Sequence, residues 1–155
     1  MAGLVVIGYD GSRHARHAIE LAARPLGAEA AVIVNVWHRG LAEAEVAVPP
    51  TVPTAPPLQV DADLERGARQ VADEGAALAR DAGLIAETDV RPGASVGEIA
   101  AALIEVAEQR DADFIVVGRR GMSRLRAVVL GSVSEATVRG ASRPVVVVPI
   151  PDGED

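Results

Sequence analysis

The sequence predicts an α/β protein with an open, mainly parallel sheet and helices on both of its faces. Short apolar runs rich in Val and Ile alternate along the chain with longer segments whose apolar residues recur at helical spacing. The chain has 155 residues, of which 49% are hydrophobic and 24% charged, and this balance is typical of one soluble domain. We therefore expect one domain over residues 1–150, with a Pro-rich insertion at 38–60 and an acidic tail at 151–155.

Five apolar runs have the length and composition of strands. They cover residues 4–8, 31–36, 84–90, 113–118 and 145–148. Apart from residues 84–90, which include polar residues at 87–89, the runs are hydrophobic almost without interruption, rather than alternating with polar residues. Such strands are buried on both faces, which is the situation in a parallel sheet between two helical layers.

Two helices are predicted from apolar stripes that stop at a glycine. The first stripe, after strand one, ends before Gly27, and its members are Ala15, Ala18, Ile19, Ala22 and Leu26. The second stripe ends before Gly83, and its members are Leu64, Ala68, Val71, Gly75 and Leu78.

Two further helices are predicted from the capping pattern in which Ser is followed three residues later by Glu. Ser95 and Glu98 start the third helix, which is expected to turn five apolar residues inward: Val96, Ile99, Ala100, Leu103 and Ala107. Ser132 and Glu135 start a short fourth helix that contains Val133 and Ala136.

Composition excludes several classes of chemistry. All fifteen basic residues are Arg and there is no Cys, so a Walker A lysine, a pyridoxal Schiff base, a thiolate nucleophile and a Cys-bound zinc are impossible. The net charge of −7 and the three aromatic residues argue against nucleic acid as a partner. No apolar run is long enough to span a membrane and no signal peptide is apparent, so we expect a cytoplasmic protein.

The segment 38–60 departs from the βα alternation because it holds five prolines and no sustained periodicity. Loops of this length inside a compact domain are usually functional or disordered. Two interpretations remain open: a lid that folds over a ligand at the carboxyl edge of the sheet, or an insertion without a role.

Two loops are expected to meet at that carboxyl edge, where open parallel sheets bind ligands. One follows strand one, with the sequence Gly-Tyr-Asp-Gly-Ser at residues 8–12, and the other runs from Gly118 to Ser132. The second loop has glycines at 118, 121 and 131, with Ser132 next. Glycines let the main chain approach an anion closely, so that successive N–H groups can point at phosphate oxygens.

Two more features of the second loop favour phosphate. Ser132 would open a helix whose free N–H groups attract negative charge. Charge-assisted contacts could come from four arginines in the loop, Arg119, Arg120, Arg124 and Arg126. The alternative is that the glycines only form turns and ease packing, while the arginines form a solvated face.

The chain resembles a single-domain universal stress protein of the ATP-binding type. The resemblance rests on three stretches: VVIGYDGS at 5–12, GRRG at 118–121 together with LGSVS at 130–134, and RPVVVVP at 143–149. It spans nearly the whole chain, and the Pro-rich stretch is its least typical part. Trp37 and His38 are a second departure, in a place where they could alter base preference.

The resemblance implies a Rossmann-like sheet of the adenine nucleotide alpha hydrolase-like type, in the order 3-2-1-4-5, with ATP between the ends of strands one and four. It implies that Asp10 contacts the ribose or the adenine end and that Val36 lines the adenine pocket. Mg²⁺ is an optional companion of the ATP. The expected cofactor-binding set is Tyr9, Asp10, Val36, Gly118, Arg119, Arg120, Gly121, Gly131, Ser132, Val133 and Ser134.

The resemblance also implies a homodimer formed through strand 145–148. The residues agree, because this strand would otherwise leave an apolar edge exposed. In the alternative, the tail or the acidic charge protects that edge in a monomer.

Other interpretations of single residues were weighed. Asp10 could instead be a metal ligand or a helix cap, and His14 and His17 have a spacing that can hold a metal, although surface positions suit them better. Ser123, Ser132, Ser134 and Ser142 do not lie in a G-x-S-x-G setting, and no base pairs with a nucleophile, so no catalytic residue is predicted. A response-regulator receiver would place Asp10 and Asp89 at strand ends, but it also needs a lysine, which this chain lacks. A dinucleotide-binding domain needs G-x-G-x-x-G after strand one, and Gly8 and Gly11 do not form that pattern.

We therefore expect a nucleotide-dependent, dimeric stress-response switch. Two rival functions stay open: an interaction protein that binds no nucleotide, and a slow ATPase.

Overall fold

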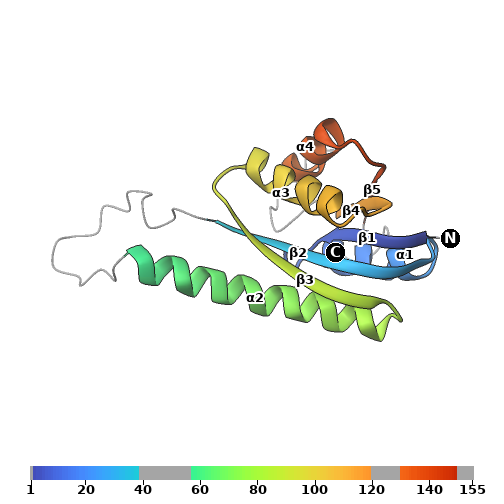
Figure 1. Ribbon diagram of the computed structural model, residues 1–155, viewed down its shortest axis with the longest axis horizontal. Helices are drawn as coiled ribbons and strands as arrows, with labels where there is room; N and C mark the ends of the chain where they lie inside the picture. Colours follow the sequence, from blue (N-terminus) through green and yellow to red (C-terminus); the bar gives the residue numbers. More distant parts are fainter. Residues whose placement is uncertain (1, 39–56, 120–129, 150–155) are drawn as a thin grey trace.

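The computed structural model describes residues 2–38, 57–119 and 130–149 (Figure 1). Five strands form one parallel sheet in the order β3-β2-β1-β4-β5, which confirms the predicted fold class and strand order. The strands are β1 (Ala2–Gly8), β2 (Ala28–His38), β3 (Ile85–Gly93), β4 (Phe114–Gly118) and β5 (Val145–Val148). The helices are α1 (Arg13–Ala23), α2 (Pro57–Asp81), α3 (Val96–Gln109) and α4 (Ser132–Gly140).

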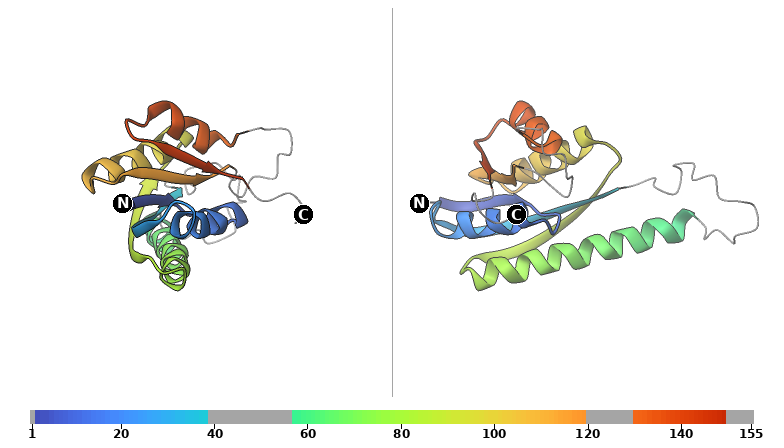
Figure 2. Two further views of the ribbon diagram at one scale, coloured as in Figure 1. Left: turned by 90° about the vertical axis from the view of Figure 1, so that its right-hand side faces the viewer. Right: turned by 180° about the vertical axis from the view of Figure 1, so that it is seen from behind.

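Helices cover both faces of the sheet (Figures 1 and 2). On one face, α1 and α2 pack over Val5, Ile7 and Ile33, while on the other, α3 and α4 pack over Val6, Val32 and Ile115. All six of these strand residues are at most 1% exposed. The continuous apolar runs are therefore buried on both sides, as their composition predicts.

Strand boundaries differ from the sequence prediction mainly by extension. Strand β2 continues to His38 and β3 continues through Pro92, which pairs with Trp37. Proline is tolerated there because β3 is an edge strand, where one N–H of every two has no neighbouring strand to bond. Asp113 lies outside β4, and its Oδ2 instead accepts the N–H groups of Gly3 and Leu4, each at 3.1 Å.

Helix α1 ends earlier than predicted. It stops at Ala23, and Leu26 lies beyond it, packed against the core from the following turn. Pro25 has no N–H with which to continue the helical ladder, and its effect outweighs the apolar spacing. Gly27 has a φ of +64°, as expected for a glycine that redirects the chain into β2.

Helix α2 begins at Pro57, so the predicted limits of the Pro-rich insertion are wrong at both ends. His38 belongs to β2 and residues 57–60 belong to α2, while 39–56 lie outside the described residues, as does the predicted tail at 151–155. Proline suits the first turn of a helix, where its missing N–H would have no intrahelical partner. The buried residues of α2 are small: Ala68, Ala72, Gly75, Ala76 and Ala79. Of the other predicted positions, Val71 and Leu78 are half-buried and pack on the core, and Leu64 is half-buried.

The two predicted capping boxes have different outcomes. Ser95 is the N-cap of α3, and its Oγ accepts the N–H of Glu98 at 3.2 Å. Val96, predicted to face inward, is 39% exposed, because the first turn of α3 projects into solvent. Ser132 caps nothing: Gly131 is the N-cap of α4, and it offers no side chain to the free N–H groups.

Within the described ranges, no helix combines the length and the apolar character needed to cross a bilayer.

Candidate functional site

The candidate site lies where β1 and β4 end side by side in the middle of the sheet. Ile7 pairs with Val116, so the segments that leave β1 after Gly8 and β4 after Gly118 start next to each other. From this point the chain after β1 leads to β2 on one side, and the chain after β4 leads to β5 on the other. The direction of winding therefore reverses at this point, and open parallel sheets bind ligands at such a switch point.

The exit from β1 is a tightly hydrogen-bonded turn. Asp10 Oδ1 accepts the N–H of Ser12 at 2.9 Å, and Gly11 between them has a φ of +80°. Ser12 is the N-cap of α1, with its Oγ accepting the N–H of Ala15 at 3.2 Å. Asp10 is therefore not the helix cap, and the capping alternative for it is wrong. Its half-buried carboxylate stands at the carboxyl edge.

Tyr9 points away from the edge and into the core. Its ring is 2% exposed, and its hydroxyl donates to Glu74 Oε1 of α2 at 2.9 Å. The same oxygen accepts Arg16 Nη2 of α1 at 2.7 Å. Burial raises the pKa of the Tyr9 phenol, and the hydrogen bond to Glu74 raises it further, so the hydroxyl stays a donor at neutral pH. The side chain of Tyr9 is therefore engaged inside the protein and does not face the edge of the sheet.

The exit from β4 is tied to the start of α4. The N–H of Gly131 donates to the carbonyl of Arg119 at 2.7 Å, and Ser134 Oγ donates to the carbonyl of Gly118 at 2.7 Å. Ser134 is 3% exposed, so its side chain serves as an internal tie, and Val133 packs on the core. These two bonds place the uncapped N-terminus of α4 at the end of β4.

That N-terminus presents main-chain donors. The first N–H groups of a helix have no intrahelical acceptor, and those of Ser132, Val133 and Ser134 receive no side-chain cap from Gly131. Together with the helix dipole, they form a place for a negative group. Arg119 adds a cation nearby: its Nε is buried without a hydrogen-bond partner among the described residues.

The end of β2 is the third segment at this edge of the sheet. Val36 is half-buried against α3. It also lies close to Gly93, because a Cβ built on Gly93 would be 2.8 Å from Val36 Cγ1. Asn35, one residue earlier, is 9% exposed and donates from Nδ2 to the carbonyl of Tyr9 at 2.8 Å. Sequence reasoning missed Asn35, although a lone polar residue inside an apolar run was its signal.

Other predicted positions do not join the described part of the site. Arg120 and Gly121 fall outside the described residues, as do Arg124 and Arg126. His17 Nδ1 contacts Glu20 Oε2 at 3.1 Å on the outer side of α1. Across the described ranges, no group of three His, Asp or Glu side chains could hold a metal ion.

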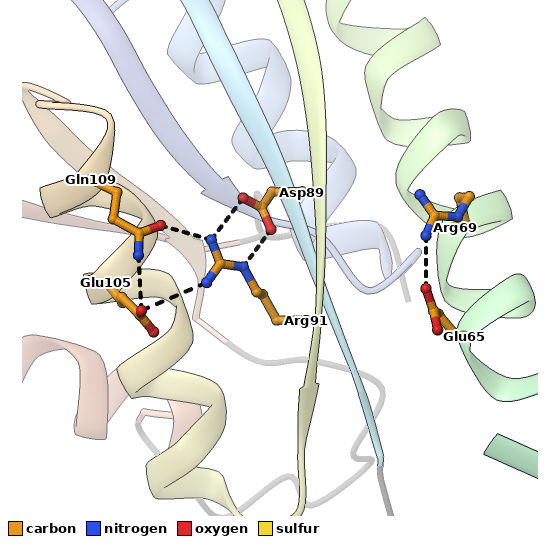
Figure 3. Close-up of polar contacts among 6 residues, drawn as sticks. All are labelled: Glu65, Arg69, Asp89, Arg91, Glu105 and Gln109. Atoms are coloured by element: carbon orange, nitrogen blue, oxygen red, sulfur yellow. Dashed lines mark hydrogen bonds and ion pairs between the residues drawn. The ribbon is translucent and has the colours of Figure 1, made fainter. Parts of the chain in front are cut away.

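Asp89, which would be a receiver aspartate in the response-regulator alternative, forms an ion pair with Arg91 instead. In Figure 3 it holds Arg91 in a two-pronged contact, with Nε at 2.6 Å from Oδ1 and Nη2 at 3.1 Å from Oδ2. Gln109 of α3 accepts from the same guanidinium at 2.8 Å, and Glu105 lies 3.8 Å from it. The hydrogen bond to Asp89 raises the pKa of Arg91. This network fastens the edge strand β3 to α3, which is a structural role.

Comparison with known proteins places the chain in a family. A model of the universal stress protein family matches residues 1–149. Universal stress protein MJ0531 of Methanocaldococcus jannaschii is 36% identical over 77 residues, or 50% of this chain and 43% of that protein. Universal stress protein MJ0577 of the same organism is 35% identical over 46 residues, or 30% of this chain and 28% of that protein. The matched parts thus span less than half of either relative.

Solved structures agree in fold over the whole chain. The structure of hypothetical protein MJ0577 has a TM-score of 0.77 at 20% identity and covers 99% of both chains. A universal stress protein in complex with cAMP has a TM-score of 0.63 at 23% identity, over 95% of this chain and 97% of that one. The universal stress protein of Archaeoglobus fulgidus in complex with dAMP has a TM-score of 0.58 at 18% identity, over 96% and 97%.

At these identities the structures show a shared fold, while the family model shows descent. Because that model matches residues 1–149, the chain belongs to the universal stress protein family.

Proposed function

We propose that this protein binds ATP or a related adenine nucleotide between the ends of β1 and β4. The observation that carries the proposal is the uncapped N-terminus of α4, drawn to the end of β4 by the bonds from Gly131 to Arg119 and from Ser134 to Gly118. Main-chain donors held at a fixed place offset phosphate charge without rearrangement on binding.

Each predicted residue has a role in this proposal. Asp10 contacts the ribose or the adenine end, and Val36 is an apolar wall for the base. Gly118 and Gly131 let the main chain come close to the ligand, and the first N–H groups of α4, at Ser132, Val133 and Ser134, bind phosphate oxygens. Arg119 contributes charge, and Arg120 and Gly121 follow from the family resemblance. Tyr9 contributes by its place directly before Asp10, because its side chain is buried and both of its main-chain groups are hydrogen-bonded to β2. Mg²⁺ would accompany the phosphates rather than bind to a protein site.

Two relatives support an adenine nucleotide as the ligand class. Universal stress proteins of the same fold have been solved in complex with cAMP and with dAMP. The two ligands share the adenine base and a phosphate. Both parts have counterparts in the proposed site, in the apolar wall at β2 and the donors at α4.

A fluorescence titration tests the proposal. Trp37 is the sole tryptophan of the chain, half-buried and directly after Val36, so a base bound at Val36 should change its emission. We expect the emission to change saturably with ATP. Asp10→Ala should reduce the affinity for ATP about tenfold or more, which corresponds to the free energy of one hydrogen bond to a charged group. Asp81→Ala, at the exposed end of α2, is the matched control and should bind normally.

Calorimetry with ATP, ADP, AMP and GTP in parallel gives the preference. Heat and fluorescence that stay unchanged up to millimolar ATP would remove the proposal. Equal affinity for ATP and GTP would retain phosphate binding and reject the adenine wall.

We further propose that the nucleotide-bound protein is a homodimer joined along β5. The carbonyls of Pro144, just before β5, and of Val148 accept the N–H groups of Ile115 in β4 and of Arg119 just after β4, so alternate residues along β5 face β4. Val145 and Val147, in between, direct their N–H groups to the open side of the sheet. Such an edge is a template for a second strand.

The dimer proposal gives a selective test. Val147→Pro removes an outward N–H and should leave the bonds to β4 intact, whereas proline at Val146 would break them. We expect sedimentation to give twice the 16.0 kDa chain mass for the unmodified protein with ATP and a single chain mass for Val147→Pro. If Val147→Pro stays dimeric, the interface lies elsewhere than at β5. If ATP does not change the dimer population, dimerisation does not depend on the nucleotide, and the proposed nucleotide-dependent switch is rejected.

A further inference from the structure

We propose that Asn35 is a positioning residue for the nucleotide site, because its side-chain amide holds the peptide group that aims Asp10. This inference rests on the proposed function. Asn35 lies in β2 next to Val36, and its Nδ2 donates to the carbonyl of Tyr9 at 2.8 Å. The bond thus joins the exits of two strands that are both expected to contact the ligand.

The location of Asn35 makes a polar side chain costly there. Asn35 is 9% exposed and is one of three buried polar residues in the described part of the chain. An amide taken out of water destabilises the fold unless its hydrogen bonds are replaced. An aliphatic residue would continue the strand at no such cost, so the bond to Tyr9 accounts for the asparagine.

The bond acts on Asp10 through the geometry of the peptide group. The Tyr9 carbonyl and the Asp10 N–H belong to one planar unit, so fixing the carbonyl oxygen fixes the direction in which the main chain enters Asp10. The N–H of Tyr9 donates to the carbonyl of Val34 at 2.9 Å. Both main-chain groups of Tyr9 are therefore held by β2, immediately before the chain leaves the sheet.

The side chain of Tyr9 completes the anchorage. Its hydroxyl is bound to Glu74, which also receives Arg16, so Tyr9 is connected to α1 and α2 as well as to β2. Asp10, by contrast, is held by its own turn to Ser12. Without the Asn35 bond, the peptide group between Tyr9 and Asp10 would lose the contact that fixes its carbonyl, and the aspartate would be held less precisely beside the ligand.

Asn35→Leu tests this role, because leucine has a similar size and no donor. We expect the Kd for ATP to rise about three- to tenfold, the equivalent of one neutral hydrogen bond. Val106→Ala is the control: it removes buried volume from α3, at 0% exposure, and should lower stability while leaving the Kd unchanged. Asn35→Ser, with a hydroxyl too short to reach Tyr9, is a second variant if leucine prevents folding.

A double-mutant cycle separates positioning from general destabilisation. If Asn35 acts through Asp10, Asn35→Leu should change the Kd less than twofold when Asp10→Ala is already present. Equal effects in both backgrounds, or an unchanged Kd in the single variant, would overturn the inference.

Amide exchange provides a readout that needs no ligand. The N–H of Ser12 is bonded to Asp10, and we expect its hydrogen exchange to accelerate in Asn35→Leu and not in Val106→Ala. Unchanged exchange at Ser12 would also overturn the inference. Accelerated exchange in a protein that binds no nucleotide would retain the positioning of Asp10 and reject the proposed function.

Discussion

Gly131→Val is expected to abolish nucleotide binding and to leave the protein folded. Gly131 is the N-cap of α4 with φ −67° and ψ 151°, an extended conformation that valine adopts without strain. Its N–H bond to Arg119 can also persist in the variant. What changes is the open approach to the first N–H groups of the helix, because a branched side chain would stand where the phosphates are proposed to lie.

The expected loss can be estimated from the bonds that the side chain would block. A hydrogen bond to a charged group contributes about 1.5–3 kcal/mol, so losing two of them weakens binding by about a hundredfold or more. Replacing glycine at an N-cap by valine costs stability of only about 1 kcal/mol. Titration of Trp37 fluorescence reports the first quantity and urea unfolding the second.

Gly67→Val is the matched control for Gly131→Val. Gly67 lies in α2, and a Cβ built on it meets nothing within 4 Å. This variant should bind ATP like the unmodified protein. If Gly131→Val binds equally well, the N-terminus of α4 is not the phosphate site. The corresponding substitution at Gly121 falls outside the described residues.

Much of the fold could be predicted because its determinants are local. A valine run such as Val145–Val148 has both the composition and the length of a buried strand, and its limits are confirmed. The errors arose where a local rule competed with another. Pro25 ends α1 before Leu26 in spite of the apolar spacing, and Gly131 takes the N-cap in place of Ser132.

The site was predicted less completely, for a physical reason. The glycines and the helix start stand in sequence order, so spacing indicates them. The contact of Asn35 with Tyr9 joins residues 26 positions apart, and that of Tyr9 with Glu74 joins residues 65 apart. Such contacts depend on how strands and helices pack, and one sequence carries no signal of them beyond a polar residue in an apolar run.

Gly75→Val is expected to cause the largest loss of stability among the substitutions considered. Gly75 is a position of close approach between α2 and the core: a Cβ on Gly75 would lie 2.7 Å from Tyr9 Cδ1 and 2.9 Å from Ile33 Cγ2. Neither atom can move away easily, because the Tyr9 ring is buried and tied to Glu74 and Ile33 is 0% exposed.

The magnitude follows from two opposing effects. Overpacking a core costs about 1–3 kcal/mol and sometimes more, so Gly75→Val should lower the free energy of unfolding by roughly 3 kcal/mol. Gly75→Ala gains about 1 kcal/mol of helix propensity, and we expect its clash to exceed that gain, for a net loss of about 1–2 kcal/mol. Urea unfolding with an unchanged slope would report both values.

Gly67→Ala separates packing from propensity within the same helix. It makes the same chemical change where the added methyl meets no neighbour, so it should raise the free energy of unfolding by up to about 1 kcal/mol. Opposite signs at Gly67 and Gly75 would show that α2 needs a glycine only where it lies on Tyr9. A stabilised Gly75→Ala would mean that α2 can move outward at little cost, and Tyr9 would then be anchored by Asn35 and Val34 rather than by the helix.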